Sequence, residues 1–218
     1  MIYVLVPFSA LFVLYLRQEN RYRFRPATIL KVGLTSLLSL CLLLGLIGDF
    51  TPPGLLFFCG MCCAAAGDYY LQFIRRDNGK FIRGICAFGV TQLFYLTALH
   101  LLVPFTQAEL FCLLGFAAAT AFVKLHFRWD TSAADPWLTL YTALVTLTGA
   151  KAASLLFVVP ASPELLLLGM GGFLFYLSDM VLGLWNYQKT HILLADLNWL
   201  LYFYGQFLLA AGILFDRL

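Results

Sequence analysis

Charged side chains are scarce in this sequence: Asp, Glu, Lys and Arg make up 11% of its 218 residues. A water-soluble domain carries roughly 25% charged and 45–50% apolar residues. Here the apolar share is 62%, and the mean hydropathy is +0.87. The composition therefore excludes a water-soluble fold and predicts an integral membrane protein that is surrounded by the lipid bilayer.

The sequence also lacks a strong net charge and a complete set of metal ligands. The net charge is only +3, so there is no basic surface of the kind that nucleic acid requires. Cys59, Cys62 and Cys63 resemble half of a zinc site, but no second Cys or His pair lies at ligand spacing elsewhere. We interpret the cysteines as packing residues. We expect no metal site and no nucleic-acid partner.

Long apolar stretches fill nearly the whole chain. A membrane helix needs about 20 mostly apolar residues, and eight windows of the sequence qualify. They run approximately over residues 1–16, 27–47, 53–74, 81–103, 107–127, 137–159, 164–187 and 192–215. Turn-forming residues such as Pro52-Pro53 and Asp77-Asn78-Gly79 separate them. We therefore predict an all-α fold, a polytopic bundle of about eight transmembrane helices, in a single domain over residues 1–218.

Lys and Arg gather in alternate connections of this bundle. The connections after the first, third, fifth and seventh windows hold Arg17, Arg21, Arg23, Arg25, Arg75, Arg76, Lys80, Arg83, Lys124, Arg128 and Lys189. The opposite side has only Arg217, and Lys31 and Lys151 lie inside windows. Because cytoplasmic loops carry the excess of Lys and Arg, we predict that the basic loops are cytoplasmic and both termini extracytoplasmic. The short termini favour the inner (plasma) membrane of a bacterium.

Two acidic residues fall well inside apolar windows: Asp68 in the third and Asp179 in the seventh. An acid at the centre of a membrane helix costs about 2.5–3.5 kcal/mol on insertion scales, so it usually faces the bundle interior and serves a function. The alternative is a buried strut that only hydrogen-bonds one helix to another. We take both residues as candidates for the functional centre.

Further polar side chains fall at compatible depths in other windows. They are Lys31, Gln92, Tyr95, Tyr141, Ser178, Asn198, Tyr202 and Gln206. Three of them, on the eighth window, recur every four residues and so form one stripe along a helix. We predict a polar cavity in the cytoplasmic half of the bundle, with both aspartates facing it.

The roles of Lys151 and the histidines are less defined. Lys151 lies deeper, where it could snorkel to the membrane surface, pair with an acid or meet a ligand headgroup. His100 and His126 fall near window ends, which favours an interfacial position over a catalytic one, and His191 falls in a loop.

Three motifs, in order on separate windows, carry a family resemblance. They are Gly67-Asp68-x-x-Leu71, Gly172-x-Leu174-Phe175-x-x-Ser178-Asp179-x-x-Leu182 and Tyr202-x-x-x-Gln206-x-Leu208. In these motifs the sequence resembles the YhhN-like proteins, which include the eukaryotic lysoplasmalogenases. It departs from the family pattern at Gln92, where a His is usual, and at Lys151, where an Arg is usual.

The resemblance implies a hydrolase without metal or organic cofactor. Its substrates would be lysoplasmalogens, which are 1-alkenyl glycerophosphoethanolamines or -cholines, and its products a fatty aldehyde and a glycerophospho-base. Asp68 and Asp179 would be catalytic, and the other polar residues would bind the lysophospholipid. Gln92 cannot transfer a proton as a His does. If the family His takes part in the chemistry, we expect a slower enzyme or a different lysolipid substrate; if that His only hydrogen-bonds, the change is mild.

The chemistry of enol ethers suits two carboxyl groups. Cleavage begins with proton transfer to carbon and passes through an oxocarbenium ion, as in glycosidases, where one carboxylic acid donates and one carboxylate stabilises. Burial disfavours the charged form of a carboxyl group, so our hypothesis makes the deeper Asp179 the acid and Asp68, near Lys31 in depth, the ionised partner.

Two other functions remain open: a proton-coupled carrier of small molecules or lipids, and a hydrolase of another lysolipid. Intramembrane acids also suit carriers, but no window has the paired Gly/Pro interruptions of discontinuous transporter helices. The sequence makes no prediction of the oligomeric state.

Overall fold

The computed structural model describes residues 2–73, 77–126, 135–160, 162–188 and 192–215, and within these ranges the chain forms helices and no β-strand. Eight α-helices follow one another: α1 (Ile2–Glu19), α2 (Phe24–Leu46), α3 (Pro52–Leu71), α4 (Asn78–Leu102), α5 (Gln107–His126), α6 (Asp135–Ser154), α7 (Pro163–Gln188) and α8 (Ile192–Ile213). A 3₁₀ turn, Leu155–Phe157, continues α6. The predicted all-α fold is confirmed, although the sixth helix ends before the predicted residue 159.

Six of the helices, α2 to α7, are long and apolar enough to cross a membrane. The length and apolar composition of these helices indicate a multi-pass membrane protein. Of the other two, α1 has 18 residues and ends in charged ones, and α8 carries the polar stripe predicted from Asn198, Tyr202 and Gln206. The full count of about eight spans stays a prediction.

Local signals in the sequence set the starts of α3 and α4. Pro52 and Pro53 occupy the first turn of α3, where a missing N–H costs nothing. Asp77 caps α4, since its side chain accepts a hydrogen bond of 3.0 Å from the backbone N–H of Lys80. These features explain why the breaks between helices could be read from the sequence.

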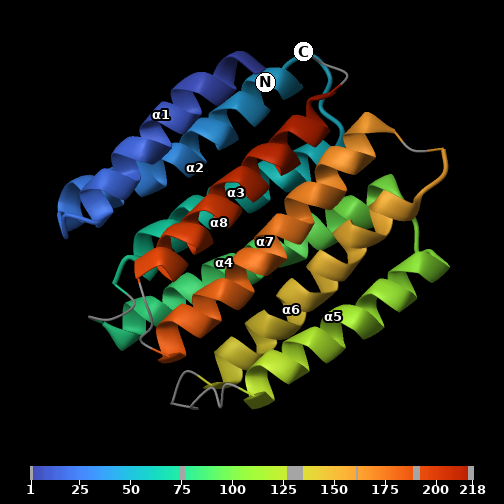
Figure 1. Cartoon of the computed structure of the whole chain (residues 1–218). Coiled ribbons are helices and arrows are strands. Elements are labelled where there is room, and N and C mark those ends of the chain that lie inside the picture. Colours follow the sequence, from blue (N-terminus) through green and yellow to red (C-terminus); the bar gives the residue numbers. More distant parts are fainter. Residues whose placement is uncertain (1, 74–76, 127–134, 161, 189–191, 216–218) are drawn as a thin grey trace.

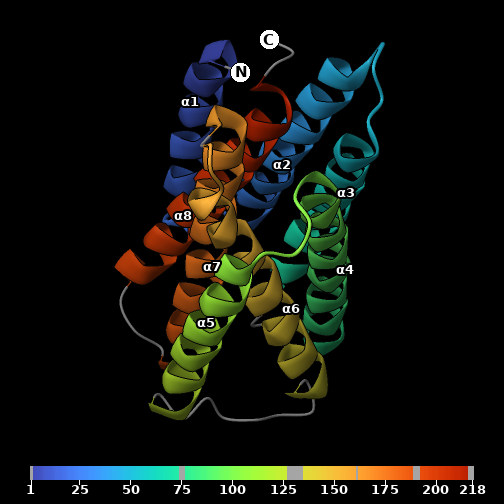
Figure 2. The same cartoon turned by 90° about the vertical axis from the view of Figure 1, so that its right-hand side faces the viewer.

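The helices form a closed ring in the order α2, α3, α4, α6, α7 and α8, in which each contacts the next and α8 contacts α2. Helix α1 packs outside the ring on α2, and α5 packs outside it on α6. Figure 1 shows these two outer helices on opposite sides of the bundle, and Figure 2 shows α5 in front, beside α6. Groups that point inward from the ring therefore meet at its centre.

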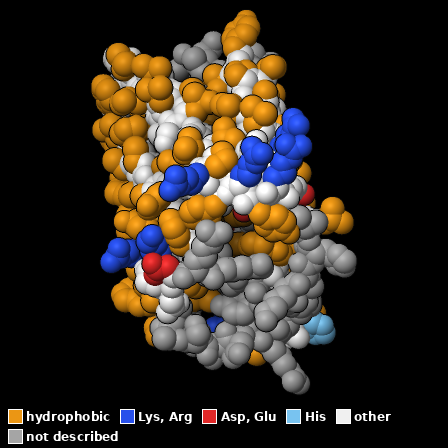
Figure 3. All heavy atoms as spheres, turned by 90° about the vertical axis from the view of Figure 1, so that its left-hand side faces the viewer, with side chains coloured by type: hydrophobic (Ala, Val, Ile, Leu, Met, Phe, Trp, Pro, Cys, Tyr) orange, Lys and Arg blue, Asp and Glu red, His pale blue; other side chains and the backbone are white. Residues whose placement is uncertain are grey.

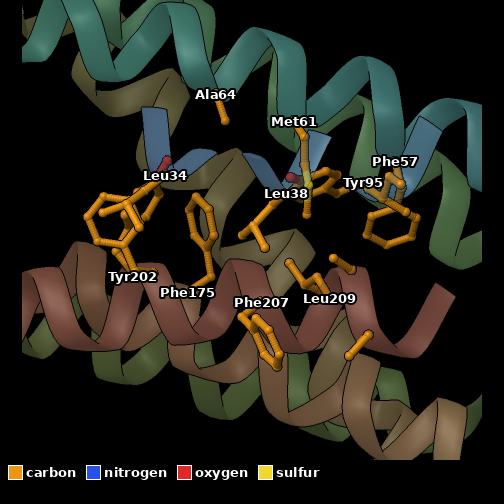
Figure 4. Packing of buried hydrophobic residues seen from close by; sticks show 14 of the residues in the cluster. Leu34, Leu38, Phe57, Met61, Ala64, Tyr95, Phe175, Tyr202, Phe207 and Leu209 are labelled. Carbon is orange, nitrogen blue, oxygen red and sulfur yellow. The ribbon is translucent and has the colours of Figure 1, made fainter. Parts of the chain in front are cut away.

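The centre of the ring is filled mostly by apolar side chains. Leu38, Met61, Phe175 and Phe207 come from four helices and meet there, as Figure 4 shows. Small residues let backbones approach: a Cβ atom on Gly171 would lie 2.9 Å from the carbonyl oxygen of Gly205. Such close van der Waals contact drives helix association where lipid removes the hydrophobic force.

Basic residues gather at one end of the bundle, where α1, α3 and α7 end and α2, α4 and α8 begin. Figure 3 views the bundle from the left-hand side of Figure 1 and shows Lys and Arg side chains across the middle of the visible face, next to hydrophobic side chains. The described members of this set are Arg17, Arg21, Arg23, Arg25, Lys80, Arg83 and Lys124. The predicted members Arg75, Arg76, Arg128 and Lys189 lie outside the described residues, as does His191. We call this the basic end.

Candidate active site

Asp68 lies inside the ring, near the end of α3, with an exposed fraction of 1%. Its Oδ2 atom accepts two hydrogen bonds, one of 2.5 Å from the hydroxyl of Thr35 and one of 2.8 Å from the hydroxyl of Tyr202. Lys31 Nζ lies 3.5 Å from its other oxygen, Oδ1. These partners come from α2 and α8, so the carboxyl group joins three helices. All three partners are donors, an arrangement that suits a carboxylate.

Lys31 is as buried as Asp68 and has an aromatic neighbour. Its Nζ atom lies 4.1 Å from the centre of the Trp199 ring, a distance at which a cation is attracted by the ring face. Oδ1 of Asp68 accepts no hydrogen bond from the described part of the protein. We call Lys31, Thr35, Asp68, Trp199 and Tyr202 the Asp68 cluster.

Asp179 lies on α7 and is hydrogen-bonded to a residue of α6. The hydroxyl of Tyr141 donates a hydrogen bond of 2.9 Å to Asp179 Oδ2. Asp179 is half-buried, whereas Asp68 is fully buried. An exposed part of a side chain in a membrane helix can face lipid as well as water, so the expectation that Asp179 is the less hydrated of the two stays a prediction.

The two aspartates belong to separate hydrogen-bond clusters, but their helices meet at one cavity. A cavity of about 40 Å³ at the basic end is lined by Glu19, Leu71, Gln72, Leu182, Trp185 and Trp199. Leu71 follows Asp68 by three residues and Leu182 follows Asp179 by three, so each leucine lies on roughly the same helix face as its aspartate. The motif Asp-x-x-Leu thus places each carboxyl about one turn from this cavity.

Two more predicted residues bond to each other. Tyr95 donates a hydrogen bond of 2.7 Å from its hydroxyl to Oε1 of Gln206, and its ring stacks on Phe57 with centroids 4.8 Å apart. Gln92 and Tyr95 line a second cavity of about 10 Å³ near the ring centre, which is the size of about one water molecule. The side-chain nitrogens of Gln92 and Gln206 have no acceptor among the described residues.

Ser178 and Asn198 form contacts within and between helices. The Ser178 hydroxyl donates to the carbonyl oxygen of Phe175, one turn earlier in α7, at 2.7 Å. Asn198 donates from Nδ2 to the carbonyl oxygen of Ser178 at 2.7 Å and so ties α8 to α7. Their predicted contact with substrate stays a prediction.

Lys151, whose role was left open, pairs with an acid at the end of the bundle opposite the basic end. Its Nζ lies 2.8 Å from Glu109 Oε2 and 3.1 Å from the carbonyl oxygen of Pro104. Glu109 Oε1 lies 2.9 Å from Nε2 of His100, whose Nδ1 lies 2.9 Å from the carbonyl oxygen of Leu96. We call His100, Glu109 and Lys151 the Glu109 cluster.

Sequence reasoning missed Thr35, Trp199 and Glu109. Thr35 and Trp199 could have been found by helical spacing, since Thr35 follows Lys31 by four residues and Trp199 precedes Tyr202 by three. Glu109 gave no such signal, because an acid in the first turn of a helix is common. Among the described residues, no group of three His, Cys, Asp or Glu side chains is placed to hold a metal ion.

Comparison with known proteins adds a family assignment to this geometry. No curated protein and no solved structure matches the chain. All three motifs, and both aspartates with their partners on α2, α6 and α8, fall within residues 20–213. A model described as the YhhN family matches these residues 20–213, so the chain belongs to the YhhN family.

Proposed function

We propose that the chain is a membrane-embedded lysoplasmalogenase-like hydrolase. It would hydrolyse the vinyl-ether bond of a 1-alkenyl lysophospholipid and release a fatty aldehyde and a glycerophospho-base. The observation that carries the proposal is the Asp68 carboxyl group, which is buried among three donors and lies one turn from a cavity that the Asp179 helix also lines. Buried acids of this kind usually serve a function.

The proposed reaction begins with proton transfer from the Asp179 carboxyl group to the alkene carbon that is not bonded to oxygen. The double-bond electrons form the new C–H bond, and an oxocarbenium ion results. Asp68, as a carboxylate, stabilises this cation and accepts a proton from the water that attacks it. As the C–O bond between the hemiacetal carbon and the glycerol oxygen breaks, Asp68 donates its proton to the glycerol oxygen and the hydroxyl proton of the hemiacetal passes to Asp179. The aldehyde retains the oxygen of water, and both carboxyl groups return to their starting states.

The neighbours of the two carboxyl groups support this division of roles. Asp68 faces donors only, as a carboxylate requires, and Asp179 has one hydroxyl donor, Tyr141, which leaves a carboxyl oxygen to carry a proton. Lys31 and the Arg-rich connection between α1 and α2 would attract the phosphate group. The proposal places the basic end in the cytoplasm of a bacterial cell, with the active site toward that side.

The test is aldehyde release by the purified full chain from a 1-alkenyl lysophospholipid. We expect release from the wild type, and a loss of about 100-fold or more in Asp68→Asn and in Asp179→Asn. Asp196→Asn is the matched control, because Asp196 bonds to Asn20 at the basic end, apart from both clusters. Near-wild-type turnover in either variant contradicts the two-carboxylate mechanism. Proton-dependent uptake into vesicles without aldehyde indicates a carrier, and release from an acyl lysolipid alone indicates a different hydrolase.

A further inference from the structure

The cavity at the basic end combines an acid, an amide and two indole rings, supplied by Glu19, Gln72, Trp185 and Trp199. The proposed mechanism uses none of these four groups for chemistry. We propose that this cavity binds the primary ammonium group of a phosphoethanolamine headgroup. The proposal names the headgroup that the hydrolase selects and rests on the proposed function for its substrate class.

Beside the indole N–H groups, the cavity offers acceptor oxygens from Glu19 and Gln72. Gln72 donates from Nε2 to Glu19 Oε2 at 2.9 Å, which leaves the amide oxygen of Gln72 and the second oxygen of Glu19 free of that bond. Within the described residues, no Lys, Arg or His forms an ion pair with Glu19. A primary ammonium group has three N–H donors and no acceptor, so it complements this set.

The indole rings provide a wall suited to a cation. Trp185 and Trp199 have ring centroids 6.4 Å apart at an angle of 69°. Trp199 already has one ammonium group over its ring, that of Lys31 at 4.1 Å. Tryptophan attracts cations more strongly than other aromatic residues do. An acid beside two such rings therefore favours a cationic ligand over a neutral one.

The order of charges matches a zwitterion. Glu19 and Trp199 line the cavity, Lys31 Nζ lies 4.1 Å from the centre of the Trp199 ring, and the same Nζ lies 3.5 Å from Asp68 Oδ1, so the lysine lies between the two acids. In a phosphoethanolamine lipid, the ammonium group is terminal and the phosphate follows it. With the ammonium at Glu19, the phosphate faces Lys31, and the glycerol end continues toward Asp68. Leu71 and Asp68 are three residues apart, a rise of about 4.5 Å.

The size of the cavity sets the preference among headgroups. A volume of about 40 Å³ accommodates a few water-sized groups, which suits an ammonium group and the adjoining methylene. A trimethylammonium group is larger and has no N–H to donate. A glycerol headgroup has no cation. The expected order of affinity is ethanolamine, then choline, then glycerol.

The experiment measures binding of 1-alkyl lysophospholipids with these three headgroups to the full chain by titration calorimetry. The alkyl ether lacks the double bond and is not cleaved, so binding is read without turnover. We expect Glu19→Gln to weaken the ethanolamine ligand about ten-fold and to leave the glycerol ligand unchanged. Trp185→Leu should act in the same direction, with a smaller loss in Trp185→Phe. Asp196→Asn, an acid of the same end outside the cavity lining, should change nothing.

Equal affinity of the wild type for the three headgroups overturns the proposal, and so does an equal loss for all three in Glu19→Gln. The two proposals fail separately. Headgroup-selective binding without aldehyde release from the alkenyl lipid supports the ammonium site and contradicts the proposed hydrolase activity. Aldehyde release together with equal binding of the three headgroups supports the hydrolase activity and contradicts the ammonium site.

Discussion

The described part of the chain contains two buried pairs of a lysine and a carboxylate, and they are built differently. In the Glu109 cluster, Lys151 Nζ lies 2.8 Å from one carboxylate oxygen and His100 lies 2.9 Å from the other. In the Asp68 cluster, Lys31 Nζ is 3.5 Å from Oδ1, and two hydroxyl groups share Oδ2. In the Glu109 cluster, each carboxylate oxygen has a close partner, and we call Lys151 and Glu109 the complete pair. In the Asp68 cluster, Oδ1 has a single and more distant partner, and we call Lys31 and Asp68 the incomplete pair.

The difference indicates which pair is structural and which is available to a ligand. A buried charge is costly unless it is paired and hydrogen-bonded, and the Glu109 cluster meets this requirement with its own residues. Asp68 meets it only in part, and its helix leads into the cavity at the basic end. We infer that the complete pair stabilises the fold and the incomplete pair can bind a water molecule or a substrate.

The position of each pair in the fold supports this distinction. Helix α5 packs outside the ring on α6 (Figure 2), and its buried residues are Glu109 and Thr120. The contact of Glu109 with Lys151 is therefore a main polar attachment of α5 to the bundle. Asp68, by contrast, lies among α2, α3 and α8, which are held together by the apolar core as well.

The largest effect should come from removing the cation of the complete pair. Lys151→Met leaves Glu109 buried with only His100 opposite, and we expect a loss of about 3–5 kcal/mol in the free energy of unfolding. Thermal or denaturant unfolding of the purified protein measures it. The folded fraction should keep its specific activity within about two-fold, because the change is far from the cavity. A stable but inactive variant would contradict the structural role of this pair.

A smaller effect, on activity and not on folding, should come from the incomplete pair. Tyr202→Phe removes one hydrogen bond to Asp68 Oδ2 and leaves the ring and its packing in place. Hydrogen bonds to charged groups contribute about 1.5–3 kcal/mol, so kcat/KM for aldehyde release should fall about 10- to 100-fold. Thr35→Val tests the other hydroxyl with a side chain of similar shape. Tyr204→Phe, which breaks only the bond to Ser9, serves as the matched control and should keep most activity.

Much of the Asp68 cluster could be predicted from the sequence. Apolar windows and their breaks located the helices, and counting residues from the basic loops gave Lys31 and Asp68 similar depths. The four-residue recurrence on α8 identified Tyr202 as an inward-facing residue. These inferences succeed because they depend on helix geometry, which a sequence determines locally.

The Glu109 cluster could not be predicted in the same way. Its members lie on α4, α5 and α6, and their meeting depends on how α5 packs against the ring. A window of residues contains no information on that packing. The assignment of Asp179 as the less hydrated carboxyl group stays a prediction for a similar reason, since depth along a helix does not specify which neighbours cover each side chain.

The smallest effect should follow from changing the histidine that contacts the complete pair. His100 contacts a carbonyl oxygen through Nδ1 and a carboxylate oxygen through Nε2. Both atoms that it faces are acceptors, so both contacts are hydrogen bonds only when each ring nitrogen carries a hydrogen. Gln in this position keeps a donor for Glu109 but not the imidazole ring.

If Lys151 supplies most of the charge compensation, His100→Gln should cost only about 0.5–1.5 kcal/mol, the usual worth of one hydrogen bond. Unfolding of His100→Gln and Lys151→Met under one set of conditions measures the ratio. Equal losses would mean that Glu109 depends on both partners alike, and that the histidine matters as much as the lysine. A loss several-fold smaller for His100→Gln assigns the attachment of α5 to the Lys151–Glu109 contact itself, whose 2.8 Å separation distinguishes it from the 3.5 Å contact at Asp68.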